Sequence, residues 1–508
     1  MKEIGLYIHI PYCKSKCNYC DFISFAGKEE TIKRYIETML KEIDECSFSG
    51  FNIGTIYIGG GTPSFIDSIY IIELVNKIKE KFIVSQNAEI TIEINPGTIT
   101  KEKLLDYKKA GINRISIGLQ STDNEILKTI GRIHTYEDFL ENYELARSLG
   151  FNNINIDLML ALPEENEGSI AMQISEIINL QPEHISVYSL ILEDDTPLKK
   201  MVESGDIVLP TDDEERKMYW RVKELLEEND YIHYEISNYS KKGYQSKHNM
   251  DCWNQNEYLG FGVAAHSYYN KVRFSNPLTI EEYIQNYNNK TIEEEQTKEE
   301  QAKEFMMLGL RKIEGVSISS FERKFQINPL FYFRFEISKL VDEGLIEIDL
   351  DSIKLTRKGL DLANLVWEEF VWLSFGHGRL SKNRERQSDV SFGLKGILIL
   401  IIKDTKQNVK SVSCLLFLEK QCLIHAFYFF QFFMEFFYGS MFHKSIFSIS
   451  IVWNFFISIN YFCYFICYFN QMNVLISVTP PLISPWVKNN VICINEFIIE
   501  WHMLPPLL

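Results

Sequence analysis

Residues 9–22, HIPYCKSKCNYCDF, place three cysteines close together directly after a short apolar run. Cys13, Cys17 and Cys20 follow the spacing C-x3-C-x2-C. A structural zinc site normally needs a fourth ligand, and no Cys or His pair that would complete such a site follows nearby. A disulfide would leave one thiol over. Three thiolates fit a four-iron cluster with one iron open to a substrate or cofactor, so the spacing predicts an iron–sulfur centre here, with zinc as the alternative.

Composition excludes several other classes of protein. The chain has 508 residues, enough for two or three domains, and a formal net charge of −17. An acidic chain lacks the clustered Lys and Arg that hold nucleic-acid phosphates, so we expect no nucleic-acid partner. The start, MKEIGLYIHI, does not resemble a secretory signal, and ten cysteines without export indicate reduced thiols. The prediction is a cytoplasmic protein.

Short strand-like runs recur along the chain up to about residue 371. They are LYIHI, TIYIGG, ITIEI, RISIGL, INIDLML and HISVYSL. Segments with helical apolar spacing lie between them, among them residues 31–43, 70–82, 135–149 and 169–180. Six βα units in succession predict an α/β fold with a parallel sheet, either curved into an open barrel or wound flat.

Polar residues and glycines stand where these runs end. They are Gly59, Gly60, Gly61, Glu93 and Gln120, and Asp157 interrupts the fifth run. The carboxyl ends of barrel strands form one mouth, where chemistry is located, and the cysteines follow the first strand. We therefore expect these residues to face the cysteine loop, although any one of them taken alone could be a strand-end cap.

Five segments resemble the radical S-adenosylmethionine (radical SAM) superfamily, and within it the HemW-type haem chaperones. They are YIHIPYCKSKCNYCDF, GGGTPS, EINPGT, SIGLQS and HNMDCWNQNEYLGFG. These chaperones are relatives of the oxygen-independent coproporphyrinogen III oxidases. The resemblance runs to about residue 371, and it implies an open parallel (β/α)6 partial barrel of radical SAM type within residues 1–296.

The resemblance also implies a set of cofactor contacts. Cys13, Cys17 and Cys20 would ligate three irons of a [4Fe–4S] cluster, and S-adenosylmethionine would chelate the fourth. Glu93 would hold the ribose hydroxyls, and glycines at 60 and 61 would let the backbone approach the cofactor. The implied contacts to S-adenosylmethionine are Tyr7, Tyr19, Gly60, Gly61, Thr62, Glu93, Gln120, Arg132 and Asp157.

Three departures from the family pattern bear on function. The oxidases carry an extra cysteine where this chain has Phe22, which favours the chaperone branch. The chaperones' haem-associated motif, which ends in Tyr-Trp, here has Cys252 in place of the tyrosine; a cysteine thiolate could itself bind haem iron, or the change is tolerated. Ala161 stands where the family usually has glycine. The implied haem residues are His248, Asn249, Cys252 and Trp253.

The leading hypothesis is a protein that binds haem and passes it to acceptor proteins, with an electron donor for the cluster. The alternative is an enzyme, an oxygen-independent coproporphyrinogen III oxidase that uses a 5′-deoxyadenosyl radical. A zinc-stabilised binding module is the third hypothesis. Whether radical turnover occurs is left open, so no residue is assigned as catalytic.

Two further regions follow the predicted core. Residues 297–371 predict a small winged-helix-like α+β domain, with helices at 299–310, 318–325 and 332–343 before the strands LIEID and SIKLT. Residues 372–508 form an atypical tail rich in Phe and Ile, without a charged residue between Lys444 and Lys488. Its length and lack of charge would suit a membrane span. Its scarcity of Leu, Ala and Gly favours a frameshift or read-through extension, so membrane contact is expected only if the tail is genuine.

Overall fold

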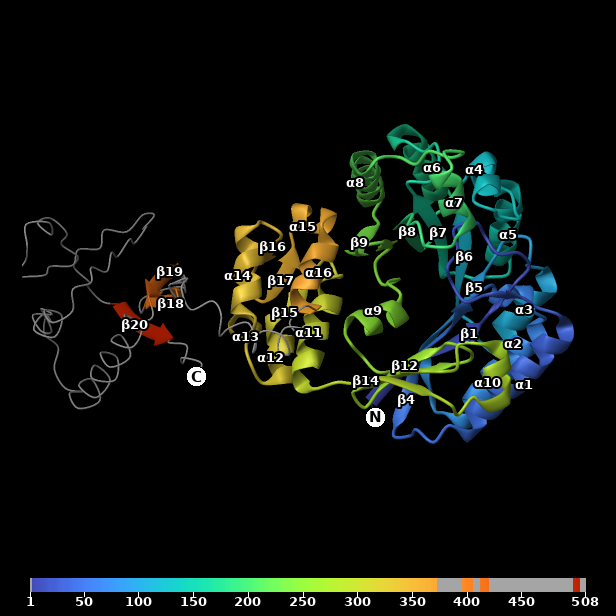
Figure 1. Ribbon diagram of the computed structural model, residues 1–508, viewed down its shortest axis with the longest axis horizontal. Coiled ribbons are helices and arrows are strands. Elements are labelled where there is room, and N and C mark those ends of the chain that lie inside the picture. The colour runs from blue at the N-terminus through green and yellow to red at the C-terminus, as the bar shows by residue number, and fades with distance from the viewer. Residues whose placement is uncertain (1, 372–394, 405–411, 420–496, 503–508) are drawn as a thin grey trace, which may run out of the picture. The chain divides into compact units, whose positions relative to one another are not determined.

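The computed structural model describes residues 2–371 and, beyond them, the strands at 395–404, 412–419 and 497–502 (Figure 1). The chain divides into two compact units, Met1–His377 and Gly378–Leu508.

A mixed sheet forms the centre of the first unit. Six of its strands are mutually parallel and lie side by side in the order in which they occur in the chain. They are β1 (Lys2–Ile10), β4 (Phe51–Gly60), β5 (Val84–Ile94), β6 (Arg114–Gln120), β7 (Ile154–Leu160) and β8 (His184–Ser189). All six predicted runs lie in these strands, which confirms the α/β fold with a parallel sheet. The curvature of a partial barrel stays a prediction.

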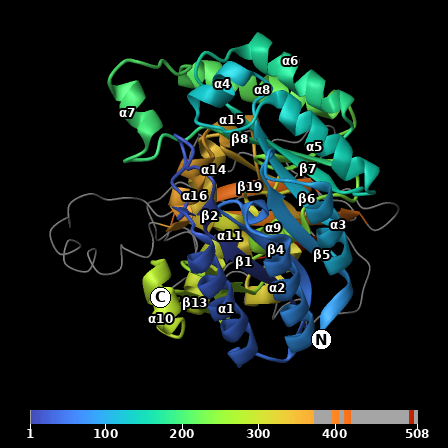
Figure 2. The same ribbon diagram turned by 90° about the vertical axis from the view of Figure 1, so that its right-hand side faces the viewer.

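Helices connect these strands and cover one face of the sheet (Figure 2). They are α1 (Glu29–Glu45), α2 (Ser68–Lys81), α3 (Lys101–Ala110), α4 (Asn124–Thr129), α5 (Tyr136–Ser148), α6 (Glu167–Asn179) and α8 (Asp212–Glu228). Thr135 and Asp138 form a reciprocal capping box that fixes the start of α5. Isoleucines such as Ile56 and Ile92 are fully buried and belong to the core between sheet and helices. This core lies between the helices and one face of the sheet, and the opposite face is made by the alternate residues of each strand.

The sheet extends on both sides of the parallel strands. β11 (Tyr258–Phe261) runs parallel to β1, and the antiparallel strands β12 (His266–Tyr269), β13 (Val272–Ser275) and β14 (Thr291–Glu295) follow it. At the other edge, β10 (Asn238–Ser240) and β9 (Ile232–Glu235) are antiparallel to their neighbours. The connections include α7 (Pro197–Glu203), α9 (Lys247–Trp253), α10 (Ile280–Asn286), the 3-10 helix η1 (Pro63–Phe65) and the short pair β2 (Tyr12–Cys13) and β3 (Phe25–Ala26).

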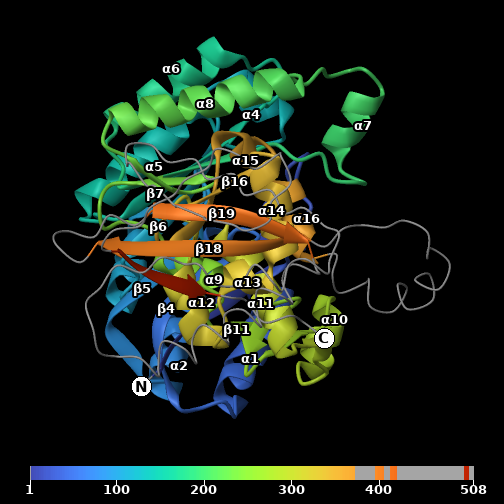
Figure 3. The ribbon, with the colours of Figure 1, turned by 90° about the vertical axis from the view of Figure 1, so that its left-hand side faces the viewer.

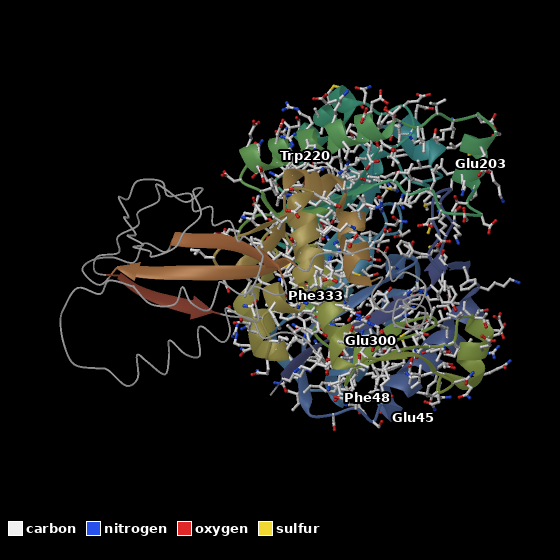
Figure 4. All side chains as sticks on the ribbon, turned by 60° about the vertical axis from the view of Figure 1, so that its left-hand side comes forward. Glu45, Phe48, Glu203, Trp220, Glu300 and Phe333 are labelled. Carbon is white, nitrogen blue, oxygen red and sulfur yellow. The ribbon has the colours of Figure 1, made fainter. Side chains whose placement is uncertain are left out.

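Residues after β14 build a second hydrophobic core, and Figure 3 shows their helices from the side. The elements are α11 (Lys298–Gly309), β15 (Val316–Ser317), α12 (Ile318–Phe325), α13 (Pro329–Tyr332), α14 (Arg334–Asp342), β16 (Ile346–Ile348), β17 (Ser352–Leu355), α15 (Arg357–Asp361) and α16 (Ala363–Val371). Phe333, labelled in Figure 4, lies in this core, and Trp220 of α8 donates to Asp361 Oδ1 at 2.8 Å. The predicted helices and strands are present, whereas the winged-helix arrangement and the boundary after residue 296 stay predictions.

In the second unit, β18 (Lys395–Asp404), β19 (Val412–Glu419) and β20 (Phe497–His502) form an antiparallel sheet in the order β19-β18-β20. Most of the apolar tail, including residues 445–470, lies outside the described residues. Within the described part of the chain, no helix is long and apolar enough to cross a membrane.

Candidate cofactor and haem site

The face of the parallel sheet opposite the helices is polar. Along each strand every second residue is apolar and lies in the helix-covered core, while the residues between are mostly polar. Parallel sheets with both faces covered are usually apolar on both sides, so this alternation marks the second face as a place for chemistry. The residues on it are Tyr7 and His9 of β1, Thr55 and Tyr57 of β4, Glu89, Thr91 and Glu93 of β5, Arg114 and Ser116 of β6, Asn155 and Asp157 of β7, and His184 and Ser186 of β8.

Hydrogen bonds connect the polar face across β6, β7 and β8. Asn155 Nδ2 donates to Ser116 Oγ and to Asp157 Oδ1, each at 2.7 Å. Asp157 also accepts from Ser116 Oγ at 2.9 Å, and His184 Nδ1 lies 2.6 Å from Asn155 Oδ1. Burial raises the pKa of Asp157, although these donors favour its ionised form. The predicted cofactor residue Asp157 therefore belongs to a buried network rather than to a strand-end cap.

Glu93 lies near the carboxyl end of β5 and is held by two donors. Tyr57 Oη donates to its Oε1 at 2.9 Å, and the backbone N–H of Gly60 donates to Oε2 at 3.1 Å. Burial, with a smaller contribution from Asp157, raises the pKa of Glu93 from 4.5 to about 7. Tyr7 stacks on Tyr57 with ring centroids 6.4 Å apart, so two predicted cofactor residues, Tyr7 and Glu93, share one neighbour.

The three cysteines lie in the loop after β1 and are anchored by neighbouring polar groups. Thr62 Oγ1 donates to Cys13 Sγ at 3.4 Å, and Arg132 Nη1 donates to Cys17 Sγ at 3.6 Å. Burial raises the pKa of the Cys13 and Cys20 thiols. Among the described residues, no set of three Cys, His, Asp or Glu side chains is arranged to hold a single metal ion. The sulfur ligands of a four-iron cluster stand farther apart than the ligands of one ion, so a cluster does not require that arrangement.

Arg132 connects the cysteine loop to the strand ends. Its guanidinium donates to Asn95 Oδ1 and to the carbonyl of Gly118 as well as to Cys17. Gln120, at the end of β6, has a φ of 79°, a left-handed conformation that is costly for a residue with a Cβ. Backbone strain at a strand end beside a buried cation is typical of a functional site. The structure thus brings Cys17, Arg132 and the end of β6 together.

Tyr19 lies in the same loop and packs partly buried against a small cluster that includes Ile126 and Leu127 of α4. Burial raises the pKa of its hydroxyl, and the Arg132 guanidinium acts in the opposite direction.

The glycines at the end of β4 and directly after it are required by close packing within the chain. A Cβ on Gly60 would lie 2.6 Å from the His9 ring, and Gly60 has a φ of 113°. A Cβ on Gly61 would lie 3.0 Å from the backbone of Pro11 and Tyr12. These contacts explain both glycines without a ligand, and the approach of a cofactor to the same backbone stays a prediction.

The predicted haem segment begins in α9, where His248 is buried against β4. His248 Nδ1 lies 2.9 Å from Thr55 Oγ1, and the imidazole stacks on Tyr57 with ring centroids 5.2 Å apart. Its backbone N–H donates to Glu89 at 3.3 Å. Burial, with Arg114 nearby, lowers the pKa of His248 to about 4, so the imidazole is neutral near pH 7. Tyr57 thus contacts both a predicted haem residue, His248, and a predicted cofactor residue, Glu93.

The rest of the haem segment differs in its surroundings. The backbone N–H of Asn249 donates to the capping hydroxyl of Ser246 at 3.4 Å. Burial, together with Asp251, raises the pKa of the Cys252 thiol to about 12. The Trp253 ring lies 4.3 Å from the guanidinium carbon of Arg311.

Two of the family departures have structural consequences. Phe22 is 70 % exposed, so it does not fill a hydrophobic core. Ala161 has a φ of 62°, which explains why glycine would be the favoured residue at this turn.

Two models of known protein families match this chain. Residues 7–174 match the Radical SAM superfamily, and residues 296–362 match the HemN C-terminal domain. The chain is 36% identical over 372 residues to the protein named Heme chaperone HemW from Lactococcus lactis, covering 73% of this chain and 98% of that protein. The chain belongs to the HemW family. The HemW protein of Bacillus subtilis is also 36% identical, over 72% of this chain and 98% of its own length.

A solved structure shows the same fold as this HemW-family chain. Coproporphyrinogen III oxidase (HemN) from Escherichia coli aligns with a TM-score of 0.64 and 22% identity, covering 73% of this chain and 90% of that chain. The radical SAM fold and the presence of a C-terminal domain are therefore confirmed. Membership of the radical SAM superfamily implies a [4Fe–4S] cluster and S-adenosylmethionine.

Sequence reasoning missed part of the polar face in this HemW-family chain. The main omissions are Thr55, Tyr57, Arg114, Asn155 and His184. The alternation of isoleucine with polar residues in TIYIGG, ITIEI and RISIGL is the signal that could have found them, because it is unusual in a buried parallel strand.

Proposed function

We propose that this chain binds haem and delivers it to acceptor proteins. The observation that carries the proposal is the 36% identity to Heme chaperone HemW of Lactococcus lactis across 98% of that protein's length. The protein would act in the cytoplasm, without a nucleic-acid partner, and an electron donor would serve its cluster.

Cys13, Cys17 and Cys20 would hold the [4Fe–4S] cluster. Thiolates are the form that binds iron, and burial opposes their formation at Cys13 and Cys20. The Thr62 hydroxyl donates to Cys13 and the Arg132 guanidinium to Cys17, and both contacts favour negatively charged sulfur. The donor set thus fits a cluster ligated by three thiolates.

Glu93, Gln120, Arg132 and Asp157 would bind S-adenosylmethionine, with Tyr7, Tyr19, Gly60, Gly61 and Thr62 close to it. Bound together, the cluster and S-adenosylmethionine would supply one-electron chemistry. The chain itself supplies a carboxylate at Glu93 that is oriented by Tyr57 and Gly60, and a second carboxylate at Asp157 that is oriented by Ser116 and Asn155.

His248 is the proposed haem-iron ligand, because a neutral imidazole is the ligand form that iron requires. Thr55 engages Nδ1 and leaves Nε2 as the nitrogen for iron. Asn249 and Trp253 would border the haem. Cys252, on the same helix, would pack beside the haem, with His248 as the iron ligand.

The experiment titrates haem into anaerobically purified protein and then adds an apo-haem protein as acceptor. We expect near-stoichiometric haem binding, transfer to the acceptor, and weaker binding with a shifted absorption band in His248→Ala. His266→Ala is the matched control, since His266 is an exposed histidine paired with Glu293 at 3.1 Å. Absence of haem binding in the wild-type protein would refute the proposal.

The oxidase remains the second candidate, because the fold matches coproporphyrinogen III oxidase (HemN) of Escherichia coli with a TM-score of 0.64. Phe22 stands where the oxidases place a cysteine, and the absence of that cysteine supports the chaperone instead. With reductant, S-adenosylmethionine and coproporphyrinogen III under anaerobic conditions, we expect no protoporphyrinogen. Sustained decarboxylation with release of 5′-deoxyadenosine would favour the oxidase.

We further propose that the chain has three parts, residues 1–296, 297–371 and 372–508, the last being a frameshift or read-through extension. Relatives matched over 98% of their own length account for only 73% of this chain, which supports an extension without a counterpart in them.

A further inference from the structure

Helix α9, which carries the proposed haem residues, lies between the sheet and the C-terminal helices (Figure 1). It packs against β4 on one side and α11 on the other. Directly after it, Gln255 Nε2 donates to the carbonyl of Gln301 at 3.0 Å and to Glu304 at 2.6 Å. Lys312 Nζ donates to Asn254 Oδ1 at 2.8 Å. The haem segment is therefore held by the C-terminal residues as well as by the core.

Arg311 lies at this junction between two indole rings. Its guanidinium carbon is 4.3 Å from the centre of the Trp253 ring and 4.9 Å from that of the Trp367 ring. Contact with two indole rings restrains the guanidinium, and its N–H groups can still donate in its own plane. A backbone hydrogen bond also joins the core to the C-terminal residues at this junction. The Ile236 N–H donates to the Arg311 carbonyl at 3.1 Å.

The donors at this junction lack acceptors. Arg311 Nε, Trp253 Nε1 and Trp367 Nε1 are each buried and have no hydrogen-bond partner in the part of the chain that the structure describes. Buried donors without partners are costly, and three around one guanidinium indicate a missing acceptor. A planar guanidinium with neighbouring N–H donors suits a carboxylate.

Glu235 is the carboxylate of the chain closest to this role, and it is poorly suited to it. Its Oε1 already accepts from the Ser237 N–H at 3.0 Å and from Asn238. Its Oε2 has no hydrogen-bond partner among the described residues, so it does not serve as an acceptor for Arg311. The side chain is fully buried, and burial raises its pKa, so a full negative charge there is disfavoured. An acceptor from outside the chain would satisfy the Arg311 donors better.

We propose that Arg311 binds a propionate carboxylate of haem, with Trp253 and Trp367 holding the guanidinium in place. This inference rests on the proposed haem-binding function. It places one edge of the haem at the junction between the core and the C-terminal residues, beside the helix that carries His248. The C-terminal region thereby contributes to the haem site itself.

The test compares haem with haem dimethyl ester, in which both propionates are blocked, by absorption titration of the full chain. The wild-type protein should bind haem at least ten-fold more tightly than the ester, a comparison that needs no variant. Arg311→Gln should weaken haem binding about ten-fold or more, leave the ester unaffected, and so abolish the preference. The haem affinity of Arg311→Lys should lie between those of the wild-type protein and Arg311→Gln, because lysine keeps the positive charge but lacks the planar guanidinium.

Arg323→Gln is the matched control, since it removes an exposed guanidinium from α12 that contacts Ser320 of the same helix, and it should change haem affinity less than two-fold. Equal losses for haem and ester in Arg311→Gln would mean that the residue is only structural and would overturn the assignment. S-adenosylmethionine is the other source of a carboxylate, so its binding to Arg311→Gln should be unchanged; a loss there with haem binding intact would also overturn it. If the wild-type protein binds haem and Arg311→Gln binds it equally well, this inference alone is refuted. If the wild-type protein binds no haem, the proposed function is refuted as well.

Discussion

Replacing Glu93 by glutamine should make the stability difference between the variant and the wild-type protein depend on pH. Glu93 has a pKa of about 7 in the folded protein, raised from 4.5 mainly by burial. The folded state therefore holds this proton more tightly than the unfolded state between pH 4.5 and 7. As pH rises through that window, the free energy of unfolding of the wild-type protein falls, because the unfolded state has released this proton while the folded state still holds it.

The size of the effect follows from the shift. A rise from 4.5 to about 7, at about 1.4 kcal/mol per pKa unit, corresponds to roughly 3 kcal/mol at pH 8. This is an upper bound, since the carboxyl keeps some contact with water. Glutamine carries no charge, but it can satisfy only one of the two donors from Tyr57 and Gly60, at a cost of about 1 kcal/mol. We expect Glu93→Gln to be less stable than wild type by about 1 kcal/mol at pH 5 and more stable by about 1–2 kcal/mol at pH 8.

The assay is urea unfolding of both proteins without S-adenosylmethionine at pH 5, 6, 7 and 8, followed by tryptophan fluorescence. The difference between the two proteins cancels the contributions of other titrating groups. Glu141→Gln, on the exposed face of α5, is the matched control and should show no such dependence. A difference that stays constant within about 0.5 kcal/mol from pH 5 to pH 8 would refute the reasoning. S-adenosylmethionine should bind the wild-type protein more tightly as pH rises through 7. Its affinity for Glu93→Gln should not change with pH over the same range.

Four further outcomes are expected. Ala161→Gly should raise the stability by about 1 kcal/mol, because Ala161 has a φ of 62°, and a lower melting temperature would contradict this. Cys252→Ser should leave the absorption spectrum of bound haem unchanged, because His248 is the proposed iron ligand; a shifted Soret band would indicate thiolate ligation. Cys17→Ala should lose the roughly four irons and the sulfide of an anaerobically reconstituted cluster, whereas stoichiometric zinc without sulfide in the wild-type protein would exclude the cluster. A chain that ends after residue 371 should fold cooperatively and keep the cluster; loss of the cluster on truncation would show that the tail is part of the protein.

The sequence predicted the centre of the fold because each parallel strand carries its own local signal. Runs such as RISIGL are short, rich in isoleucine and separated by amphipathic helices, and those helices begin and end within two residues of the predicted bounds at α1, α2, α5 and α6. The edge strands β9 to β14 were missed, because each is only three to five residues long and has no clear period.

The candidate site was likewise predicted only in part. The cysteine spacing lies within eight residues, so the sequence alone exposes it. The contact between Thr55 and His248 joins residues 193 positions apart, and no local sequence pattern predicts it. The same is true of Arg311 between Trp253 and Trp367, where three elements distant in the chain meet. Chemistry carried by one loop was therefore predicted, and chemistry assembled across strands was not.

The polar face of the sheet gives a physical reason to treat these parts as one site. Burying polar groups is costly unless they are paired, and a fold retains many of them on one face only where neighbours or ligands satisfy them. Tyr57 lies at the centre of this face, since its hydroxyl donates to Glu93 while its ring stacks on His248. Any change in the charge of Glu93 therefore acts on a side chain in direct contact with His248. The residues proposed for S-adenosylmethionine and those proposed for haem thus meet at Tyr57.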